Sequence, residues 1–519
     1  MKNKPSMALP SLDGEPRLQS RLHLLAALAL GLVLSIRDLA RVECWQDEAN
    51  EILICWGSFG GMLESILEGE LRPPLRYLLL WVWLRISQDE LWLRFLSLIF
   101  FAGAVLVGQR LAARLFGHSV AVASGYLVAT SPILVSAGTM VRSYSLDTFV
   151  TLLALEAFVR LRQEGSRGTW IRYALTSFAA LYTSYYFAFV LVAETAVVLA
   201  AGSPKTVIKR WILSQIVLAV AFVPWLPVML AQYLNARSHH WPPAAPDAYS
   251  LLGLLKSFSL GRITASTSGS PATTWVSLVF LASVLFGWVE CVRRRDGFRS
   301  RDLVLAAATL LPIAVVYGLS LAFHSVFHLR ALVLYAPLFL LTVARGAAAL
   351  RPRIVGIAAV ILAMVAGTAK LVSTEDMRFM TQGIAEAENF LASRARPEDV
   401  ILHPSHFDYF PARYYGGGRA NPPRFIYAPR VPWNWGATQV PEEVLATDLA
   451  ALAARARRVW RLTIDPVDRD FARIYRDHVD DVSFYPPMPA TPWGRAPVLR
   501  ERFGNIVVEC FDLPPSERD

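Results

Sequence analysis

The chain has 519 residues, of which 54% are hydrophobic and 18% are charged, and its mean hydropathy is +0.39. This composition excludes an ordinary soluble globular protein and predicts a polytopic α-helical membrane protein. The net charge of +10 is explained by basic residues in loops, so we expect no nucleic acid among the partners.

Apolar runs of roughly 15 to 22 residues recur between residues 21 and 371, each long enough to cross or nearly cross a hydrocarbon core of about 30 Å. The first run follows several basic residues, as in a signal peptide, but no small-residue cleavage site follows it. We therefore interpret it as a retained anchor. We predict about eleven transmembrane helices, near residues 22–36, 91–109, 118–138, 144–162, 170–184, 186–201, 210–230, 273–292, 302–322, 329–346 and 353–371.

Basic residues gather in alternate loops between these runs. Since positively charged loops remain in the cytoplasm, they place the N-terminus inside and residues 376–519 outside an inner (plasma) membrane. The loop clusters are Arg110 and Arg114; Arg160, Arg162, Arg167 and Arg172; Lys205, Lys209 and Arg210; Arg293 to Arg295, Arg299 and Arg301; and Arg345, Arg351 and Arg353.

The apolar segment "PPLRYLLLWVWLRI", residues 73–86, is not predicted to cross. It is short, carries Arg76 and Arg85, and would reverse the orientation of every later loop. We expect it to lie along the outer surface, where its aromatic residues suit the interface and its arginines can snorkel.

Acidic residues at the outer ends of the predicted spans are the candidate catalytic groups. Asp47 and Glu48 follow the first span in "ECWQDEANEIL", within a predicted catalytic outer loop of residues 37–90. A solvated loop pair needs no function. However, Asp147 lies on the same side in "MVRSYSLDTF", at the start of a span where an unpaired carboxylate would cost a few kcal/mol. Asp47, Glu48 and Asp147 together therefore predict one shared catalytic site.

Arginines on the same outer side are the candidate substrate-binding groups. Each alone fits an interfacial anchor, but as a group they suit a phosphate. A carboxylate could take the proton of an attacking hydroxyl while guanidinium groups stabilise a departing phosphate. Since no nucleotide sugar is expected outside, a lipid-carried sugar phosphate is the natural donor. The arginines are Arg72, Arg76, Arg142, Arg262 and Arg330.

The order of several segments resembles the C-type superfamily of membrane glycosyltransferases, and most of all the bacterial branch related to protein O-mannosyltransferases and aminoarabinose transferases. The resemblance covers residues 20–370 and is strongest over the first 160. The segments are "WQDEAN", "RPPLRYLLLWVWL", "ELWLRFLSLIFFAGAVLVGQRLAARLFG", "ATSPILVSAGTMVRSYSLDTFVTLLALEAF" and "FHLRALVLYAPLFLLTVARG".

The resemblance implies that Asp47, with Glu48 beside it, is the catalytic acid of the first outer loop and Asp147 the acid of the second, with Arg142 as its preceding basic residue. Relatives usually have His before the paired prolines, where this chain has Arg72, so the substrate can differ. Some relatives hold a divalent metal ion on the two loop acids and others work without one. A metal on Asp47 and Asp147 therefore stays open, and no other cofactor is expected.

Histidines and cysteines give weaker signals. His324 and His328 have a spacing that could bind metal, yet no acid completes the set. His239 and His240 begin a long outer loop that could cover the site. The four cysteines lack zinc-site spacing, although Cys44 and Cys55 share a loop and could pair.

Prolines, charged residues and aromatic residues dominate residues 376–519. This composition predicts a soluble α/β domain, separate from a transmembrane domain of residues 1–375. Helices are predicted at "FMTQGIAEAENFLAS" and "DRDFARIYRDHV", and strands at "DVILHP", "ARRVWRLTID" and "NIVVECFDL". The "RYYGGG" segment lacks the end of a phosphate-binding loop and predicts a turn.

These features favour a transferase that moves a hexose or pentose from a polyprenyl phosphate to a lipid, glycan or protein acceptor, with inversion. A transporter or flippase of lipid-linked sugars is the alternative, but it should show related halves and charges near the bilayer midplane, and neither is evident. A third hypothesis is a non-enzymatic envelope scaffold, in which Asp47 and Asp147 would be incidental.

Overall fold

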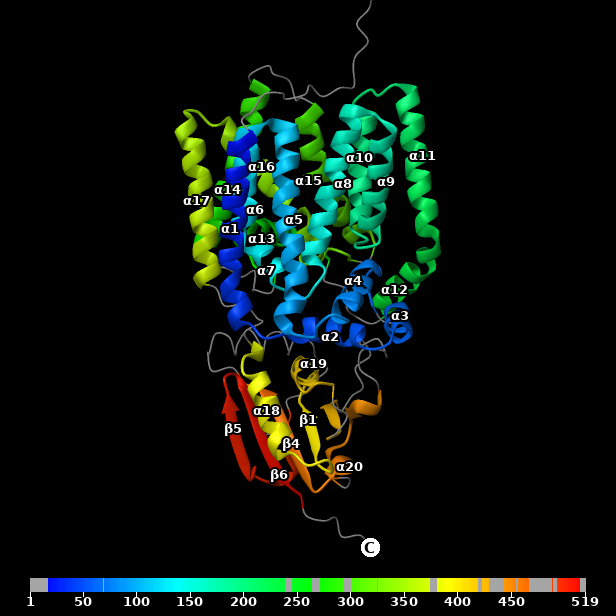
Figure 1. Ribbon diagram of the computed structural model, residues 1–519, viewed down its shortest axis with the longest axis vertical. Coiled ribbons are helices and arrows are strands. Elements are labelled where there is room, and N and C mark those ends of the chain that lie inside the picture. The colour runs from blue at the N-terminus through cyan, green and yellow to red at the C-terminus, as the bar shows by residue number, and fades with distance from the viewer. Residues whose placement is uncertain are drawn as a thin grey trace, which may run out of the picture.

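The computed structural model describes residues 17–68, 70–238, 245–263, 271–293, 300–323, 325–373, 380–418, 422–428, 442–453, 456–465, 488 and 492–513. They form a tall helical bundle with a smaller α/β region at one end (Figure 1). The long bundle helices are α1 (Arg17–Arg41), α5 (Glu90–Phe116), α6 (His118–Thr130), α7 (Pro132–Gly138), α8 (Tyr144–Glu164), α9 (Arg167–Leu181), α10 (Phe187–Ala200), α11 (Lys205–Phe222), α13 (Ala248–Leu260), α14 (Pro271–Arg293), α15 (Ser300–Ala322), α16 (Ala336–Ala349) and α17 (Arg353–Ser373).

By length and apolar composition, six of the described helices can cross a membrane, or seven if α6 and α7 form one broken span. All eleven predicted ranges fall on helical segments, so the location of the apolar helices is correct. How many of them cross remains a prediction. Helix α13 was not predicted, because it lies in a segment that we interpreted as a loop.

The break between α6 and α7 has a local cause. Pro132 has no amide proton, and the residue before a proline is pushed out of the helical region. Ser131 accordingly has φ −68° and ψ 121°, and the two helices meet at 62°.

Burial separates central from peripheral helices. The apolar stretch within Ala331–Ala349, which includes α16, is 83% buried, whereas the stretch within Lys205–Leu234, which includes α11, is 11% buried. Figure 1 shows α11 and α17 on opposite flanks of the bundle. Their exposed aliphatic side chains suit contact with lipid, and include Ile212, Leu213, Ile216, Ile357, Ile361 and Leu362.

Short helices cover the lower end of the bundle. They are α2 (Gln46–Trp56), α3 (Phe59–Glu68), α4 (Leu75–Leu84) and α12 (Leu226–Ser238). The ten residues of α4 extend about 15 Å, too short to cross, which agrees with the expectation for residues 73–86. However, α4 buries Arg76 fully instead of letting it snorkel, because it packs against α2. Cys44 and Cys55 are buried free thiols, so they do not form the possible disulfide.

The C-terminal region contains a six-stranded sheet in the order β3-β2-β1-β4-β6-β5. The first four strands are parallel, while β6 pairs antiparallel with β4 and β5. Helix α18 packs on one face through Ile384 and Leu391 against Trp460 and Val508. The elements are α18 (Ile384–Arg394), β1 (Val400–His403), α19 (His406–Tyr415), β2 (Arg424–Tyr427), β3 (Leu445–Ala446), α20 (Leu449–Ala453), β4 (Arg458–Ile464), β5 (Leu499–Phe503) and β6 (Ile506–Asp512).

The three predicted strands of this region correspond to β1, β4 and β6, and the first predicted helix to α18. The second predicted helix, residues 468–479, lies outside the described residues. The "RYYGGG" segment ends α19 at Tyr415 and turns at its glycines. Sequence reasoning missed α19, β2 and β5.

Glu43, in the connection between α1 and α2, joins the bundle to the C-terminal region. Its carboxylate accepts hydrogen bonds from the backbone N–H groups of Gly383 (2.7 Å), Ile384 (2.9 Å) and Ala385 (3.4 Å), at the start of α18. Gly383 is required there. It has φ +97°, and a Cβ atom would lie 2.0 Å from the Phe503 carbonyl oxygen.

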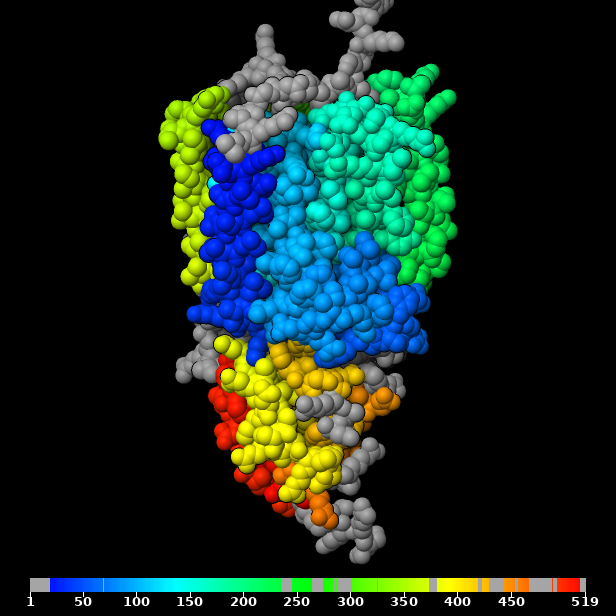
Figure 2. Space-filling model, in the orientation of Figure 1, coloured from blue at the N-terminus to red at the C-terminus, as the bar shows by residue number. Residues whose placement is uncertain are grey.

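Helix α19 makes a second contact with the bundle. The Tyr415 hydroxyl accepts from the Cys44 N–H (2.8 Å) and donates to the Glu90 carboxylate, while Tyr414 packs edge-on against Trp56. The space-filling view shows the C-terminal region meeting the level of α2 to α4 closely (Figure 2). The α/β region is thus held against the end of the bundle that carries Asp47.

The contact of Glu43 with α18 should weaken as pH rises. Burial, which outweighs the opposing backbone hydrogen bonds, raises the pKa of Glu43 to about 7. A carboxyl group with a raised pKa in the folded state stabilises most below its ordinary pKa, and that contribution is lost as pH rises through the folded pKa. We expect hydrogen exchange of residues 383–385, corrected for intrinsic rates, to lose protection between about pH 5 and pH 8. Glu43→Gln should flatten this dependence and Glu386→Gln, on the exposed face of α18, should leave it unchanged. An unaltered slope in Glu43→Gln would contradict the assignment.

Candidate active site

Helix α2 carries three acids with different surroundings. Asp47 and Glu51 are four residues apart and therefore lie on one helical face, whereas Glu48 points elsewhere. The Glu48 and Glu51 side chains are buried, and Asp47 is 22% exposed. Asp47 is thus the acid of this helix that a substrate can reach.

Two arginines from separate elements flank Asp47. Arg330 Nη1 lies 3.3 Å from Asp47 Oδ2, and Arg142 Nη2 lies 3.9 Å from the same oxygen. Arg142 Nη1 also donates to the Asp47 backbone carbonyl oxygen (3.1 Å). The Arg330 guanidinium packs 5.2 Å from the centre of the Trp45 ring. The accessible carboxylate therefore sits between two cations.

Glu51 organises the inner side of the cluster. Arg76 Nε donates to Glu51 Oε1 (2.9 Å), and Arg142 Nη1 lies 3.0 Å from Glu51 Oε2. Arg142 thereby links the Asp47 backbone to the buried Glu51 carboxylate. The Arg76 Nη1 and Nη2 atoms are buried and have no hydrogen-bond partner among the described residues.

Asp147 forms a neighbouring group at the start of α8. Arg72 Nη1 lies 3.3 Å from Asp147 Oδ2, and the Ser143 hydroxyl donates to the same oxygen (2.9 Å). Arg72 and Arg142 lie 5.2 and 6.0 Å from the centre of the Tyr144 ring. Tyr144 thus connects the Asp147 group to the Asp47 group.

Glu48 faces away from this cluster and supports it from behind. It accepts from the Val141 N–H (2.7 Å), and Arg94 Nη2 lies 3.8 Å from its other carboxylate oxygen. Arg94 also contacts Glu90 (2.7 Å), the acid that binds Tyr415 of α19. A continuous polar chain therefore runs from the C-terminal region to the residue next to Asp47.

Among the predicted site residues, the structure brings Asp47, Glu48, Asp147, Arg72, Arg76, Arg142 and Arg330 into these connected groups. Arg262 is placed differently. It pairs with Asp38 near the end of α1 and donates to the Leu371 carbonyl oxygen, so its contacts are with the bundle helices.

Sequence reasoning missed Glu51, Glu70, Glu90 and Arg94. The i, i+4 spacing of Asp47 and Glu51 is a signal that points to Glu51. Glu70 is buried, accepts from the Tyr77 hydroxyl, and has a pKa raised by that burial. Glu90 and Arg94 lie in an apolar helix and carry no signal apart from their charge.

The sequence offered two positions for a metal ion: the pair His324 and His328, and the pair Asp47 and Asp147. His324 lies outside the described residues, and His328 is half-buried close to Arg330 and Arg72. Burial and these cations lower its pKa to about 4, so its imidazole is neutral at pH 7. Over the described ranges no three His, Cys, Asp or Glu side chains are grouped as a metal site. Asp47 and Asp147 each have guanidinium partners.

The fold and the sequence were compared with known proteins. ArnT from Cupriavidus metallidurans in the apo state matches with a TM-score of 0.62 at 13% identity, covering 95% of this chain and 98% of that one. The same enzyme bound to undecaprenyl phosphate gives 0.61 at 14% identity, covering 97% and 100%. The Archaeoglobus fulgidus oligosaccharyltransferase in complex with Zn and sulfate gives 0.52 at 12% identity, covering 85% and 67%. At these identities the likeness establishes the fold.

The chain therefore has a fold like that of ArnT and of the archaeal oligosaccharyltransferase. The family model described as dolichyl-phosphate-mannose-protein mannosyltransferase matches residues 71–230, which include α4 to α11. No curated protein matches the chain significantly. The chain thus resembles ArnT in fold and the protein mannosyltransferases over part of its sequence, so the resemblance seen in the sequence is confirmed.

Glu51→Gln should destabilise the protein strongly, because it leaves Arg76 buried without its counter-charge. Breaking a buried ion pair costs about 3 to 5 kcal/mol, whereas a surface pair contributes about 0 to 1 kcal/mol. Thermal unfolding in detergent should show a large fall for Glu51→Gln and little change for Glu164→Gln, which removes the more exposed pair with Arg160. The double variant Glu51→Leu with Arg76→Met should recover only part of the loss, because Arg142 still loses its contact with Glu51. Equal melting temperatures for Glu51→Gln and wild type would contradict a buried pair of this strength.

Proposed function

We propose that this protein is an integral-membrane glycosyltransferase that transfers a sugar from a polyprenyl phosphate to an acceptor hydroxyl on the extracytoplasmic face. The observation that carries the proposal is the accessible Asp47 carboxylate flanked by Arg142 and Arg330 at one end of the bundle. The resemblance to ArnT, whose structure has been solved with undecaprenyl phosphate, supports a lipid phosphate as the donor.

In the proposed reaction, Asp47 accepts the proton of the acceptor hydroxyl as its oxygen attacks C1 of the sugar. The bond between C1 and the phosphate oxygen breaks, and the electron pair leaves with the polyprenyl phosphate. A single displacement of this kind inverts the anomeric centre. The arginines stabilise the negative charge that gathers on the leaving phosphate.

The ion pairs of Asp47 fit this sequence of events. Without a donor, Arg330 and Arg142 hold the Asp47 carboxylate. An incoming phosphate would compete for Arg330, which contacts Asp47 and the Trp45 ring. Donor binding would thereby release Asp47 for the acceptor hydroxyl, so the base becomes effective when the donor is in place.

The proposal includes the membrane arrangement predicted from the sequence. The site and the α/β region of residues 376–519 lie outside an inner membrane, and the transmembrane domain of residues 1–375 holds the donor lipid. The C-terminal region contacts the bundle beside the site through Tyr415 and Glu43, which suits a role in shaping the acceptor approach.

Asp47→Asn should remove the base while keeping the size and polarity of the side chain. Loss of a general base costs about 10²- to 10⁴-fold in rate, so sugar transfer from a polyprenyl-phosphate sugar in vesicles should fall by that factor. Expression and melting temperature should stay close to wild type. Glu48→Gln should act mainly on stability, since Glu48 is buried away from the opening. Dead Glu48→Gln with active Asp47→Asn would move the base to Glu48, and full activity of both would refute the proposed mechanism.

Arg330→Met should weaken donor use with little effect on folding. Its side chain is partly exposed, and a lost charge-assisted hydrogen bond costs about 1.5 to 3 kcal/mol, or about 10- to 100-fold in donor affinity. The measurement is the donor KM in the same transfer assay, with Arg85→Met as a control. Arg85 also lies at the lower end of the bundle, just after α4, but it donates to carbonyl oxygens of Cys55, Trp56 and Gly57. An unchanged donor KM in Arg330→Met would remove this arginine from the phosphate site.

A further inference from the structure

A buried arginine lies at the opposite end of the bundle from Asp47. Arg162, near the end of α8, is 5% exposed, and its Nε and Nη1 atoms have no hydrogen-bond partner among the described residues. Its guanidinium packs 5.9 Å from the centre of the Phe158 ring. An unpaired cation in such a position costs several kcal/mol.

Three other arginines at this end of the molecule, Arg114, Arg160 and Arg172, have acidic partners. Arg114 and Arg172 share the two carboxylate oxygens of Glu156, at 2.7 and 2.9 Å. Arg160 pairs with Glu164 (3.0 Å), one turn further along α8. Arg162 therefore differs from its neighbours in lacking a carboxylate partner within the described residues.

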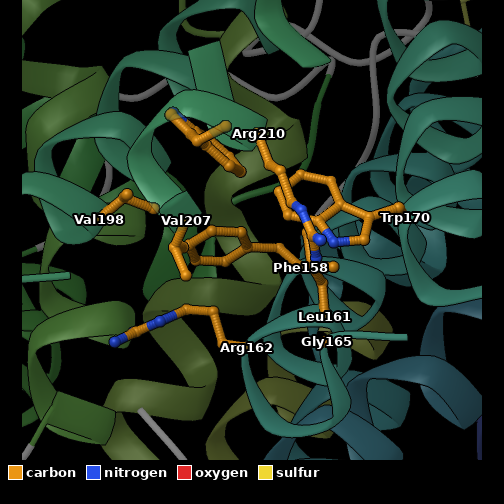
Figure 3. A pocket seen from close by; sticks show the side chains of 9 residues that line it. Phe158, Leu161, Arg162, Gly165, Trp170, Val198, Val207 and Arg210 are labelled. Atoms are coloured by element: carbon orange, nitrogen blue, oxygen red, sulfur yellow. The ribbon is translucent and has the colours of Figure 1, made fainter. Parts of the chain in front are cut away.

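Arg162 lines a cavity of about 60 Å³ between α8, α9, α10 and α11. One water needs a cavity of roughly 10 to 15 Å³, so this cavity can hold several waters or one tetrahedral anion. Arg162 and Arg210 both line the cavity; in Figure 3 the Arg162 side chain extends to the lower left, away from Arg210, and Arg210 lies beside Trp170. Arg210 is exposed and adds a second positive charge at the rim.

We propose that this cavity is a binding site for a phosphate group, with Arg162 as its buried counter-charge and Arg210 at its entrance. Guanidinium groups match the geometry of phosphate oxygens, and an anion would offset the cost of burying Arg162. The remaining walls are apolar or aromatic, from Phe158, Leu161, Val198, Val207 and Trp211. Such walls favour a phosphate attached to acyl chains, the headgroup of an anionic phospholipid, over the free ion.

The site is separate from the proposed catalytic centre. The ends of α8 and α11 that form it lie at the top of Figure 1, whereas α2 and the C-terminal region lie toward the bottom. Bound lipid there would join α8, which carries Asp147 at its other end, to α9, α10 and α11. The ligand would therefore act as a clamp between helices.

The test compares Arg162→Met with Arg160→Met in full-length protein purified in neutral detergent. Met fills a similar volume and removes the charge, and Arg160 is a more exposed arginine on the same helix. The probes are phosphatidylglycerol, zwitterionic phosphatidylcholine, and sodium phosphate against sodium chloride at equal ionic strength. Binding to the folded state raises the melting temperature in proportion to the logarithm of ligand concentration. We expect phosphatidylglycerol to raise it by at least about 2 °C in wild type and Arg160→Met, and by less than half as much in Arg162→Met.

The following outcomes support or overturn the proposed phosphate site. Without any anionic lipid, Arg162→Met should melt at or above the wild-type temperature, because it removes an uncompensated buried charge. An Arg162-dependent shift with sodium phosphate as large as that with phosphatidylglycerol would support the phosphate site and assign it to the free ion. Equal lipid shifts in wild type and Arg162→Met, or no shift beyond phosphatidylcholine and chloride in wild type, would overturn the proposal. If Arg162→Met fails to fold, Arg162→Gln is used, with the same expectations.

Discussion

The buried ion pair between Glu51 and Arg76 is the contact on which the lower end of the bundle depends. It joins α2 to α4, two helices too short to hold a position in a membrane by themselves. Because Arg142 contacts the same Glu51 carboxylate, the pair also fixes the turn between α7 and α8. Burying an isolated ion is unfavourable, so Glu51 and the two arginines, Arg76 and Arg142, require each other's opposite charges. The geometry around Asp47 follows from the placement of these three side chains.

The C-terminal region extends this dependence beyond the bundle. Tyr415 binds Glu90, Glu90 binds Arg94, and Arg94 approaches Glu48, whose other oxygen receives the Val141 N–H. Each step involves a charged or strongly polar group in a buried setting, where unsatisfied partners are costly. The α/β region is therefore coupled to the backbone of the candidate site, although none of its described residues contributes a side chain to the Asp47 group.

The sequence predicted the helical runs well, because length and apolar composition are read directly from the chain. It also predicted that Arg142 and Arg330 lie on the same side as Asp47, since loop charge fixes the side. It could not predict that Arg262 pairs with Asp38 instead, because Arg262 and Asp47 were predicted on the same side and only packing separates them. Arg76 was expected at the lipid interface, and its burial depends on Glu51, a partner that no local pattern of α4 reveals. Glu90 and Arg94 were missed for the same reason, as their partners come from distant segments.

Adjacent acids illustrate what the fold adds to the sequence. Asp47 and Glu48 carry the same charge, and at the level of the sequence only the resemblance ranks Asp47 above Glu48 as the catalytic acid. On a helix, successive residues point about 100° apart, and one of the two must face inward. Glu48 takes the inward direction and is enclosed with Arg94, while Asp47 keeps an accessible edge between two cations. Accessibility, set by helix geometry and not by residue type, is what distinguishes the group suited to chemistry from the group that holds the helix in place.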